Sequence, residues 1–148
     1  MKSNKIIKFF NNQIFRLVIP LAFILFFLIT LKRYVSVIDG PLEYLYGFPL
    51  PYTCKGWHTS LSRQYFISEM LIDFIVYFIV SYIIIFLSGR FIEGIKKSNF
   101  LSIGLWIICI FIFFSIFILS SSNDTYYLNI WFSYKLIKSD IITVFYFL

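Results

Sequence analysis

Residues that ligate metals or form disulfides are scarce in this chain of 148 residues, which has 2 Cys and 1 His. A structural zinc site needs four ligands, and the haem-attachment motif needs a second Cys directly before the His. Only Cys54 stands near His58. Cys109 lies inside a long apolar run, so we expect no disulfide between it and Cys54. The sequence therefore predicts no metal site and no cofactor.

Charged residues are also scarce, at 14% of the chain, against about 25% in an average soluble domain. Hydrophobic residues make up 60% and aromatic residues 23%. This composition excludes a disordered chain and argues against a soluble enzyme domain. With 6 Gly and 4 Pro, the chain is not collagen-like and not a linker. It contains no Gly-x-Ser-x-Gly, His-Glu-x-x-His or phosphate-binding glycine motif, so we expect no enzymatic activity.

What the sequence does contain is three apolar stretches that are long enough to cross a bilayer. About 20 apolar residues, at 1.5 Å each, span the roughly 30 Å hydrocarbon layer. We predict membrane spans at 14–31, 70–89 and 100–120. The first could instead be a cleaved signal peptide, but Leu31-Lys32-Arg33-Tyr34 stands where small residues would mark the cleavage site. The predicted fold class is an all-α membrane protein, a single domain with three transmembrane helices.

The basic residues predict how the chain is threaded through the membrane. Lys and Arg are dense in the short segments 1–13 and 90–99, and such segments stay in the cytoplasm. We therefore expect the loop 32–67 and the tail 121–148 to lie outside. The net charge of +6 is scattered over loops and span ends. Anionic lipid headgroups are thus the expected counter-charge, and no nucleic-acid partner is expected.

The outer loop 32–67 is predicted to be stiff and aromatic. Pro49 and Pro51 stand one residue apart, and prolines fix their own φ and favour extended geometry before them. One interpretation is a surface that binds a partner helix or lipid. The other, which we favour, is an interfacial cap packed on the helix ends. The candidate binding residues are Tyr46, Phe48, Pro49, Pro51, Tyr52 and Trp57.

The tail 121–148 contains two β-prone segments, 127–134 and 141–146. If Lys138-Ser139-Asp140 forms a turn, these segments make a short outer β-hairpin, which is marginal in isolation and needs a covering surface. An interfacial helix over 126–138 is the alternative.

The second span contains a polar stripe, because residues four apart share one helix face: Glu69, Asp73, Tyr77 and Ser81. Acids inside a membrane are costly and usually face the protein interior. We expect Asp73 to form an ion pair with Lys32 or Arg33 at the outer end of the first span. The alternative is a proton or cation site centred on Asp73.

Two segments resemble small, uncharacterised multi-span membrane proteins of bacteria: Gly47-Phe48-Pro49-Leu50-Pro51, and the later helix sequence Leu71-Ile72-Asp73-Phe74-Ile75-Val76-Tyr77-Phe78. The resemblance implies a multi-pass protein of the bacterial inner membrane and no particular activity. We expect a non-catalytic accessory, immunity-like or scaffold protein that binds a partner. The alternative is a subunit of a homo-oligomeric transporter or channel, built around the polar stripe.

Overall fold

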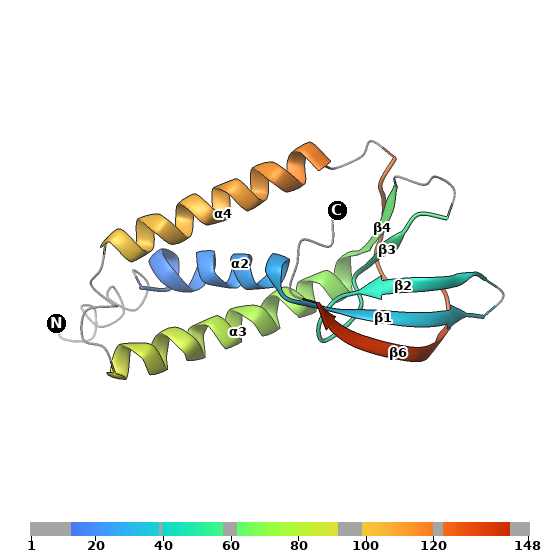
Figure 1. Cartoon of the computed structure of the whole chain (residues 1–148), viewed down its shortest axis with the longest axis horizontal. Helices are drawn as coiled ribbons and strands as arrows, with labels where there is room; N and C mark the ends of the chain where they lie inside the picture. The colour runs from blue at the N-terminus through green and yellow to red at the C-terminus, as the bar shows by residue number, and fades with distance from the viewer. Residues whose placement is uncertain (1–12, 39, 58–61, 92–98, 120–122, 143–148) are drawn as a thin grey trace.

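A computed structural model of the chain describes residues 13–38, 40–57, 62–91, 99–119 and 123–142. Three helices form one end of the elongated molecule, and a six-stranded mixed sheet forms the other end (Figure 1). The prediction of an all-α, three-span protein was therefore wrong. Much of the predicted outer loop and tail is strand, and these strands join in one sheet.

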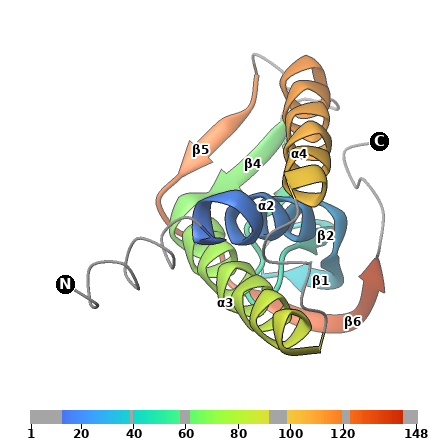
Figure 2. The ribbon, with the colours of Figure 1, turned by 90° about the vertical axis from the view of Figure 1, so that its left-hand side faces the viewer.

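The shortest of the helices lies in the middle and contacts both of the others (Figures 1 and 2). It begins with a π-helical turn, and Pro20 lies in the first turn of its α-helical part, where a missing N–H is tolerated. The helical elements are η1 (Ile14–Val18), α2 (Ile19–Leu28), α3 (Ile67–Phe91) and α4 (Asn99–Leu119).

In the described part of the chain, only α3 and α4 are long and apolar enough to cross a membrane. The first predicted span, 14–31, is helical only as far as Leu28. At 1.5 Å per residue, the helix Ile14–Leu28 rises about 22 Å, which is short of the hydrocarbon thickness. Ile29 is extended (φ −120°, ψ 119°), and Ile29 and Thr30 are β-branched residues that favour a strand. The chain therefore leaves the helix and enters the sheet directly.

The strand order is β5-β4-β3-β2-β1-β6. β4 and β5 are parallel, and the other neighbouring pairs are antiparallel. The chain thus supplies the four inner strands first and adds both edge strands from its tail. The strands are β1 (Thr30–Val37), β2 (Leu42–Tyr46), β3 (Thr53–Lys55), β4 (Arg63–Phe66), β5 (Thr125–Tyr127) and β6 (Tyr134–Ile142).

The predicted tail hairpin was wrong as well, because β5 and β6 lie at opposite edges of the sheet. The expected turn at Lys138-Ser139-Asp140 is extended strand that pairs with β1. The alternative helix over 126–138 does not form either. A two-stranded hairpin is marginal by itself, whereas each tail segment gains a ready partner strand at an edge of the sheet.

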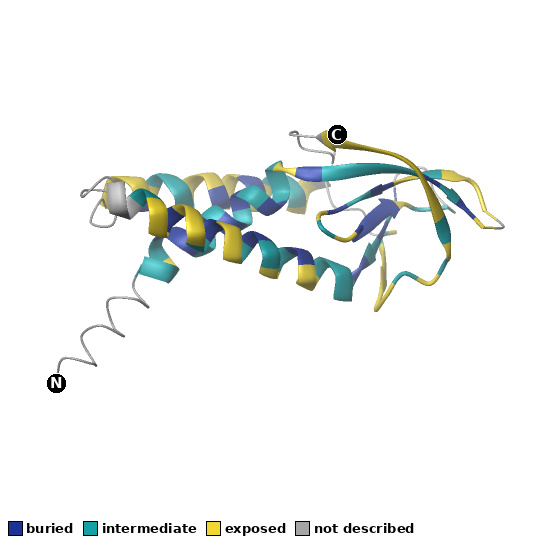
Figure 3. Cartoon of the chain, turned by 90° about the horizontal axis from the view of Figure 1, so that it is seen from below, coloured by how far each residue is buried: buried dark blue, intermediate teal, exposed yellow. Residues whose placement is uncertain are grey.

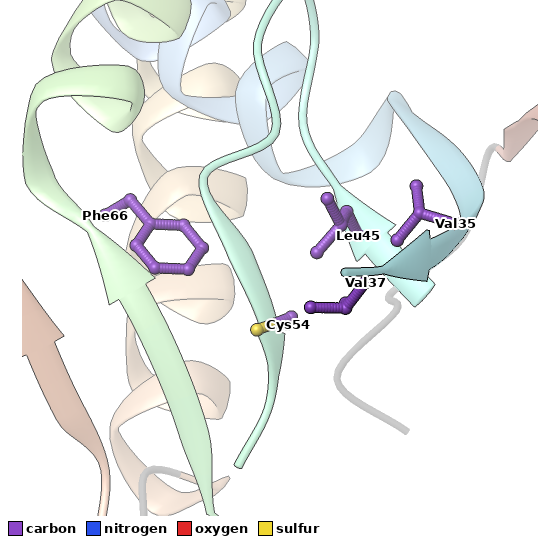
Figure 4. Close-up of a cluster of buried hydrophobic side chains, with 5 residues drawn as sticks. All are labelled: Val35, Val37, Leu45, Cys54 and Phe66. Carbon is purple, nitrogen blue, oxygen red and sulfur yellow. The ribbon is translucent and has the colours of Figure 1, made fainter. Parts of the chain in front are cut away.

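One face of the sheet carries the largest of its hydrophobic clusters (Figure 4): Val35, Val37, Leu45, Cys54 and Phe66. Strand residues alternate between the two faces, so Lys32 and Tyr34 point to the opposite face. Ile130 and Phe132, from the segment that connects β5 to β6, pack against the cluster. This connection crosses the sheet and closes its core.

The helices α3 and α4 expose apolar side chains along their length (Figure 3), whereas the inner strands of the sheet bury theirs in the cluster around Leu45. Ile79 of α3 is 51% exposed, and Phe117 of α4 is 71% exposed. Only 22% and 17% of the two long apolar helices are buried in the protein. A core helix of a soluble protein is apolar because it is buried, so these two helices need another apolar environment.

The β2 strand offers a matched test of this core. Leu45 is fully buried and Leu42 is 58% exposed. We expect Leu45→Ala to lower the free energy of unfolding by about 2–5 kcal/mol, because it leaves a cavity. Leu42→Ala should change it by less than about 0.5 kcal/mol. Chemical unfolding in detergent, followed by circular dichroism, measures both; equal losses would contradict the burial described here.

Candidate functional site

Asp73 joins the helices to the sheet. It lies on α3 and is fully buried. Its Oδ2 accepts a hydrogen bond from the N–H of Phe48 at 2.5 Å, and its Oδ1 accepts one from the N–H of Leu50 at 2.9 Å. Both donors belong to the loop between β2 and β3. One carboxylate therefore fixes that loop, residues 47–51, on the side of a helix.

The prolines explain why Asp73 can hold the whole loop. Proline has no backbone N–H, so the stretch 48–51 offers two backbone donors, and both donate to Asp73. At the loop's ends, the N–H of Gly47 donates to the Leu31 carbonyl at 3.1 Å, and the N–H of Tyr52 donates to the Tyr46 carbonyl at 2.8 Å. Every backbone donor of the loop is thus satisfied, as buried backbone requires.

Gly47 is the position where the loop must have glycine. Its φ of +148° is a conformation that other residues rarely adopt. A Cβ at this position would overlap the Leu50 carbonyl oxygen and stand 2.7 Å from the Tyr52 nitrogen. Any side chain at position 47 would therefore force the loop to move off Asp73.

Arg33 holds the same loop from the sheet side, because its guanidinium donates to the Pro49 carbonyl. We expected Lys32 or Arg33 to form an ion pair with Asp73, and the structure shows a different arrangement. Among the described residues, Asp73 forms no salt bridge with Lys32 or Arg33. The acid and the base bind the backbone of the same loop instead. Lys32 points to the other face of the sheet, with its Nζ 4.1 Å from the centroid of the Tyr44 ring.

Two other residues of the predicted polar stripe, Tyr77 and Glu69, also hydrogen-bond to segments outside α3. The Tyr77 hydroxyl donates to the Ile29 carbonyl, at the end of α2. Glu69 Oε1 accepts the N–H of Ile130 at 3.1 Å. Ser81 makes no such connection: it is fully buried, and among the residues that the structure describes its Oγ has no hydrogen-bond partner.

Aromatic rings surround the contact between Asp73 and the loop 47–51, which we call the joint because it connects the helices to the sheet. Tyr52 is 1% exposed and stacks on Phe26 of α2, with ring centroids 5.0 Å apart. Tyr77 meets Phe26 edge-on at 5.8 Å and Phe48 at 6.2 Å. Edge-to-face and stacked pairs at these distances are favourable beyond the area they bury. The joint is therefore an apolar cluster around one charge-assisted set of hydrogen bonds.

The candidate partner-binding residues lie in three places. Pro51 and Tyr52 are buried, Pro49 is half-buried and Phe48 is 41% exposed, so this part of the loop faces the helices. Tyr46 lies on the sheet face opposite the core. Trp57 packs against Trp131 and Phe132, with ring centroids 4.9 and 5.1 Å away.

The described residues contain no cluster of three or more His, Cys, Asp or Glu side chains that could hold a metal. Burial raises the pKa of Cys54 to about 12, so its thiol stays protonated at physiological pH. A protonated, buried thiol is a poor nucleophile and a poor metal ligand.

What sequence reasoning missed is the kind of partner that Asp73 has. We expected a basic side chain, and the partners are backbone amides. The signal was present in Pro49 and Pro51, which leave the stretch 48–51 only two backbone donors, so that a single carboxylate can accept both. Chemically, both carboxylate oxygens are already occupied by strong donors, which suits a structural joint.

No known protein family matches this chain, and no curated protein and no solved structure is significantly similar to it.

The joint predicts a graded response to substitution at Asp73. Asp73→Ala leaves two buried amides without an acceptor, and hydrogen bonds to charged groups contribute about 1.5–3 kcal/mol each. We expect it to lower the free energy of unfolding by at least about 3 kcal/mol. Asp73→Asn keeps one acceptor oxygen and should lose about half as much.

Asp140→Asn is the matched control, because its carboxylate is 54% exposed in an ion pair with Lys138. Exposed pairs of this kind contribute less than about 1 kcal/mol. Thermal unfolding in detergent ranks the three variants. If Asp73→Ala were as mild as Asp140→Asn, Asp73 would not hold the loop.

Proposed function

We propose that the chain is a membrane-anchored, non-catalytic accessory or scaffold protein, which presents its sheet to a partner protein at the membrane surface. The observation that carries this proposal is the contrast between the two ends of the molecule. The helices α3 and α4 expose apolar side chains along their length, whereas the centre of the sheet buries Val35, Leu45 and Phe66.

The anchor is supported by the helix surfaces. Along α3 and α4, the exposed positions are almost all aliphatic or aromatic, and such faces match lipid tails rather than water. The polar residues of α3 turn inward, toward α2 and the joint. This is the arrangement that intramembrane acids require.

The basic residues support one orientation. Arg90 lies in the last turn of α3, and Lys96 and Lys97 stand in the sequence between α3 and α4. α3 ends and α4 begins at the end of the molecule away from the sheet (Figure 1). Under the positive-inside rule this side is cytoplasmic. We propose the bacterial inner membrane as the site, with the sheet outside.

The partner surface that we propose is the sheet face opposite the core, which we name the tyrosine face. Strand register places on it Tyr34, Tyr44, Tyr46, Tyr65 and Tyr126. Tyr34 and Tyr44 pack at 4.9 Å, and Tyr65 and Tyr126 stack at 5.4 Å. Tyrosine gives rigid contact area with a polar end, which is why it is enriched in binding surfaces.

Charge indicates what kind of partner fits this face. Lys32, Lys55, Arg63 and Lys138 lie on it by register, against the acid Asp140, which pairs with Lys138 at 2.9 Å, so the charge of the face is positive. Burial raises the pKa of Tyr65 to about 12, so this phenol remains a hydrogen-bond donor at neutral pH. A protein surface rich in carboxylates would complement these cations and donors.

A transporter built on the polar stripe has less support. Both oxygens of Asp73 already accept hydrogen bonds from the loop, and an ion would have to displace them.

Photo-crosslinking in native membranes tests the proposed partner surface. We expect a photoreactive group at Tyr44 or Tyr126 to capture one defined acidic protein, because both side chains are exposed on the tyrosine face. The yield should fall as salt is raised. The same group at Ile79, on the outer face of α3, should capture lipid.

Membranes washed with alkaline carbonate provide the second readout, because an integral anchor stays in the pellet. Release of the chain into the supernatant would contradict the anchor. Self-crosslinks alone from the tyrosine face would contradict the accessory role.

A further inference from the structure

The chain that follows β5 meets the start of α3 before it crosses the sheet. The N–H of Ser68, in the first turn of α3, donates to the Leu128 carbonyl at 2.9 Å. Two residues further on, the N–H of Ile130 donates to Glu69 Oε1 at 3.1 Å. These two hydrogen bonds hold the segment 127–131 at the level of the first turn of α3.

The length of α3 sets the depth of this segment in a bilayer. The apolar stretch of α3, Ile67–Ser88, has 22 residues and rises about 33 Å at 1.5 Å per residue. The hydrocarbon layer is roughly 30 Å thick, so this stretch fills it and Ile67 lies at its boundary. Headgroups extend the bilayer to about 40–45 Å. If α3 anchors the chain, as proposed above, the segment 127–131 lies in the headgroup layer on the side of the sheet.

The side chains of the segment suit that layer. Leu128 is 72% exposed and Trp131 is 53% exposed, and the segment contains no charged residue. The rings of Trp131 and Tyr127 pack against each other, with centroids 6.0 Å apart. Tryptophan and tyrosine are enriched at membrane–water interfaces, because each ring has an apolar body and a polar end. An exposed leucine with two such rings is therefore typical of a contact with lipid.

We propose that the segment 127–131 is a lipid contact, through which Leu128 and Trp131 enter the headgroup layer. This inference rests on the membrane anchor proposed above. The contact lies on the core side of the sheet, because Tyr127 is the register partner of Phe66, so the tyrosine face stays available to a partner protein. The sheet is then held at two places, by the joint to the helices and by this segment to the lipid, which restricts its tilt.

A photoreactive diazirine side chain tests the contact in vesicles of phosphatidylethanolamine and phosphatidylglycerol. At position 128 it should add the mass of one phospholipid to the chain after illumination. The yield should be comparable to that at position 79 on the outer face of α3, where Ile79 is 51% exposed. Mass spectrometry of the intact chain measures both yields.

Leu42 is the matched control, because it is an exposed leucine of the sheet, at 58%. Its register partner Ser36 stands six residues after Thr30, the first residue of β1. Since β1 leads away from the helices (Figure 1) and a strand rises about 3.3 Å per residue, Leu42 lies about 20 Å beyond Thr30. This is outside the bilayer, so the lipid yield there should be at least about tenfold lower than at position 128.

Fluorescence quenching by nitroxide lipids gives a second readout that needs no photoreactive group. A nitroxide on the headgroup should quench Trp131, so Trp131→Phe should remove most of this quenching while it keeps an aromatic ring. A nitroxide in the middle of the acyl chain should quench Trp106 instead. Trp106 stands seven residues after Asn99, the start of α4, and so lies about 10 Å inside the hydrocarbon layer. Trp106→Phe is therefore the control for the anchor.

Failure of the contact and failure of the anchor give different results. If Ile79 yields lipid adducts and Leu128 yields no more than Leu42, the contact is overturned and the anchor stands. Headgroup quenching that Trp131→Phe leaves unchanged has the same meaning. If position 79 yields no lipid adduct and Trp106 is not quenched, the anchor itself is wrong, and the lipid contact is overturned with it.

Discussion

The carboxylate of Asp73 is the acceptor on which the arrangement of the two ends depends. A buried charge costs several kcal/mol unless it is fully hydrogen-bonded, and here the bonds come from the amides of Phe48 and Leu50. Charge-assisted bonds are about twice as strong as neutral ones. Moving the loop would leave one bare carboxylate and two bare amides together. The sheet therefore cannot swing on the helices without a large loss of stability.

This joint connects two regions that bury opposite kinds of surface. Above it, the sheet hides Val35, Leu45 and Phe66 from water. Below it, α3 and α4 expose apolar side chains, such as Ile79 and Phe117, and turn polar ones inward (Figure 3). In the proposed membrane-anchored arrangement, the joint lies where the environment changes from water to lipid, and its hydrogen bonds are shielded by the rings that surround them. A membrane-anchored protein needs a rigid connection at this depth if the sheet is to be presented in one orientation.

Apolar length alone was enough to find α3 and α4, and helical spacing found the polar stripe that contains Asp73. The sheet was missed because its strands are short and pair with distant segments. Nothing local in the tail indicates that Thr125–Tyr127 and Tyr134–Ile142 bind opposite edges of a sheet formed by the loop. The first span was predicted to run to residue 31, beyond the end of the helix at Leu28. Apolar content alone does not distinguish a buried helix from an apolar strand that follows it directly. Counting the donors left by Pro49 and Pro51 would have shown that one carboxylate can satisfy this stretch of the loop.

Hydrogen exchange tests the central claim most directly, because it reads out the two amides themselves. In the full chain in detergent, the amides of Phe48 and Leu50 should exchange as slowly as the core amides of β1. Such protection would show that the loop opens only when the sheet does. If both amides exchanged as fast as an exposed loop while β1 stayed protected, Asp73 would not hold the sheet to the helices.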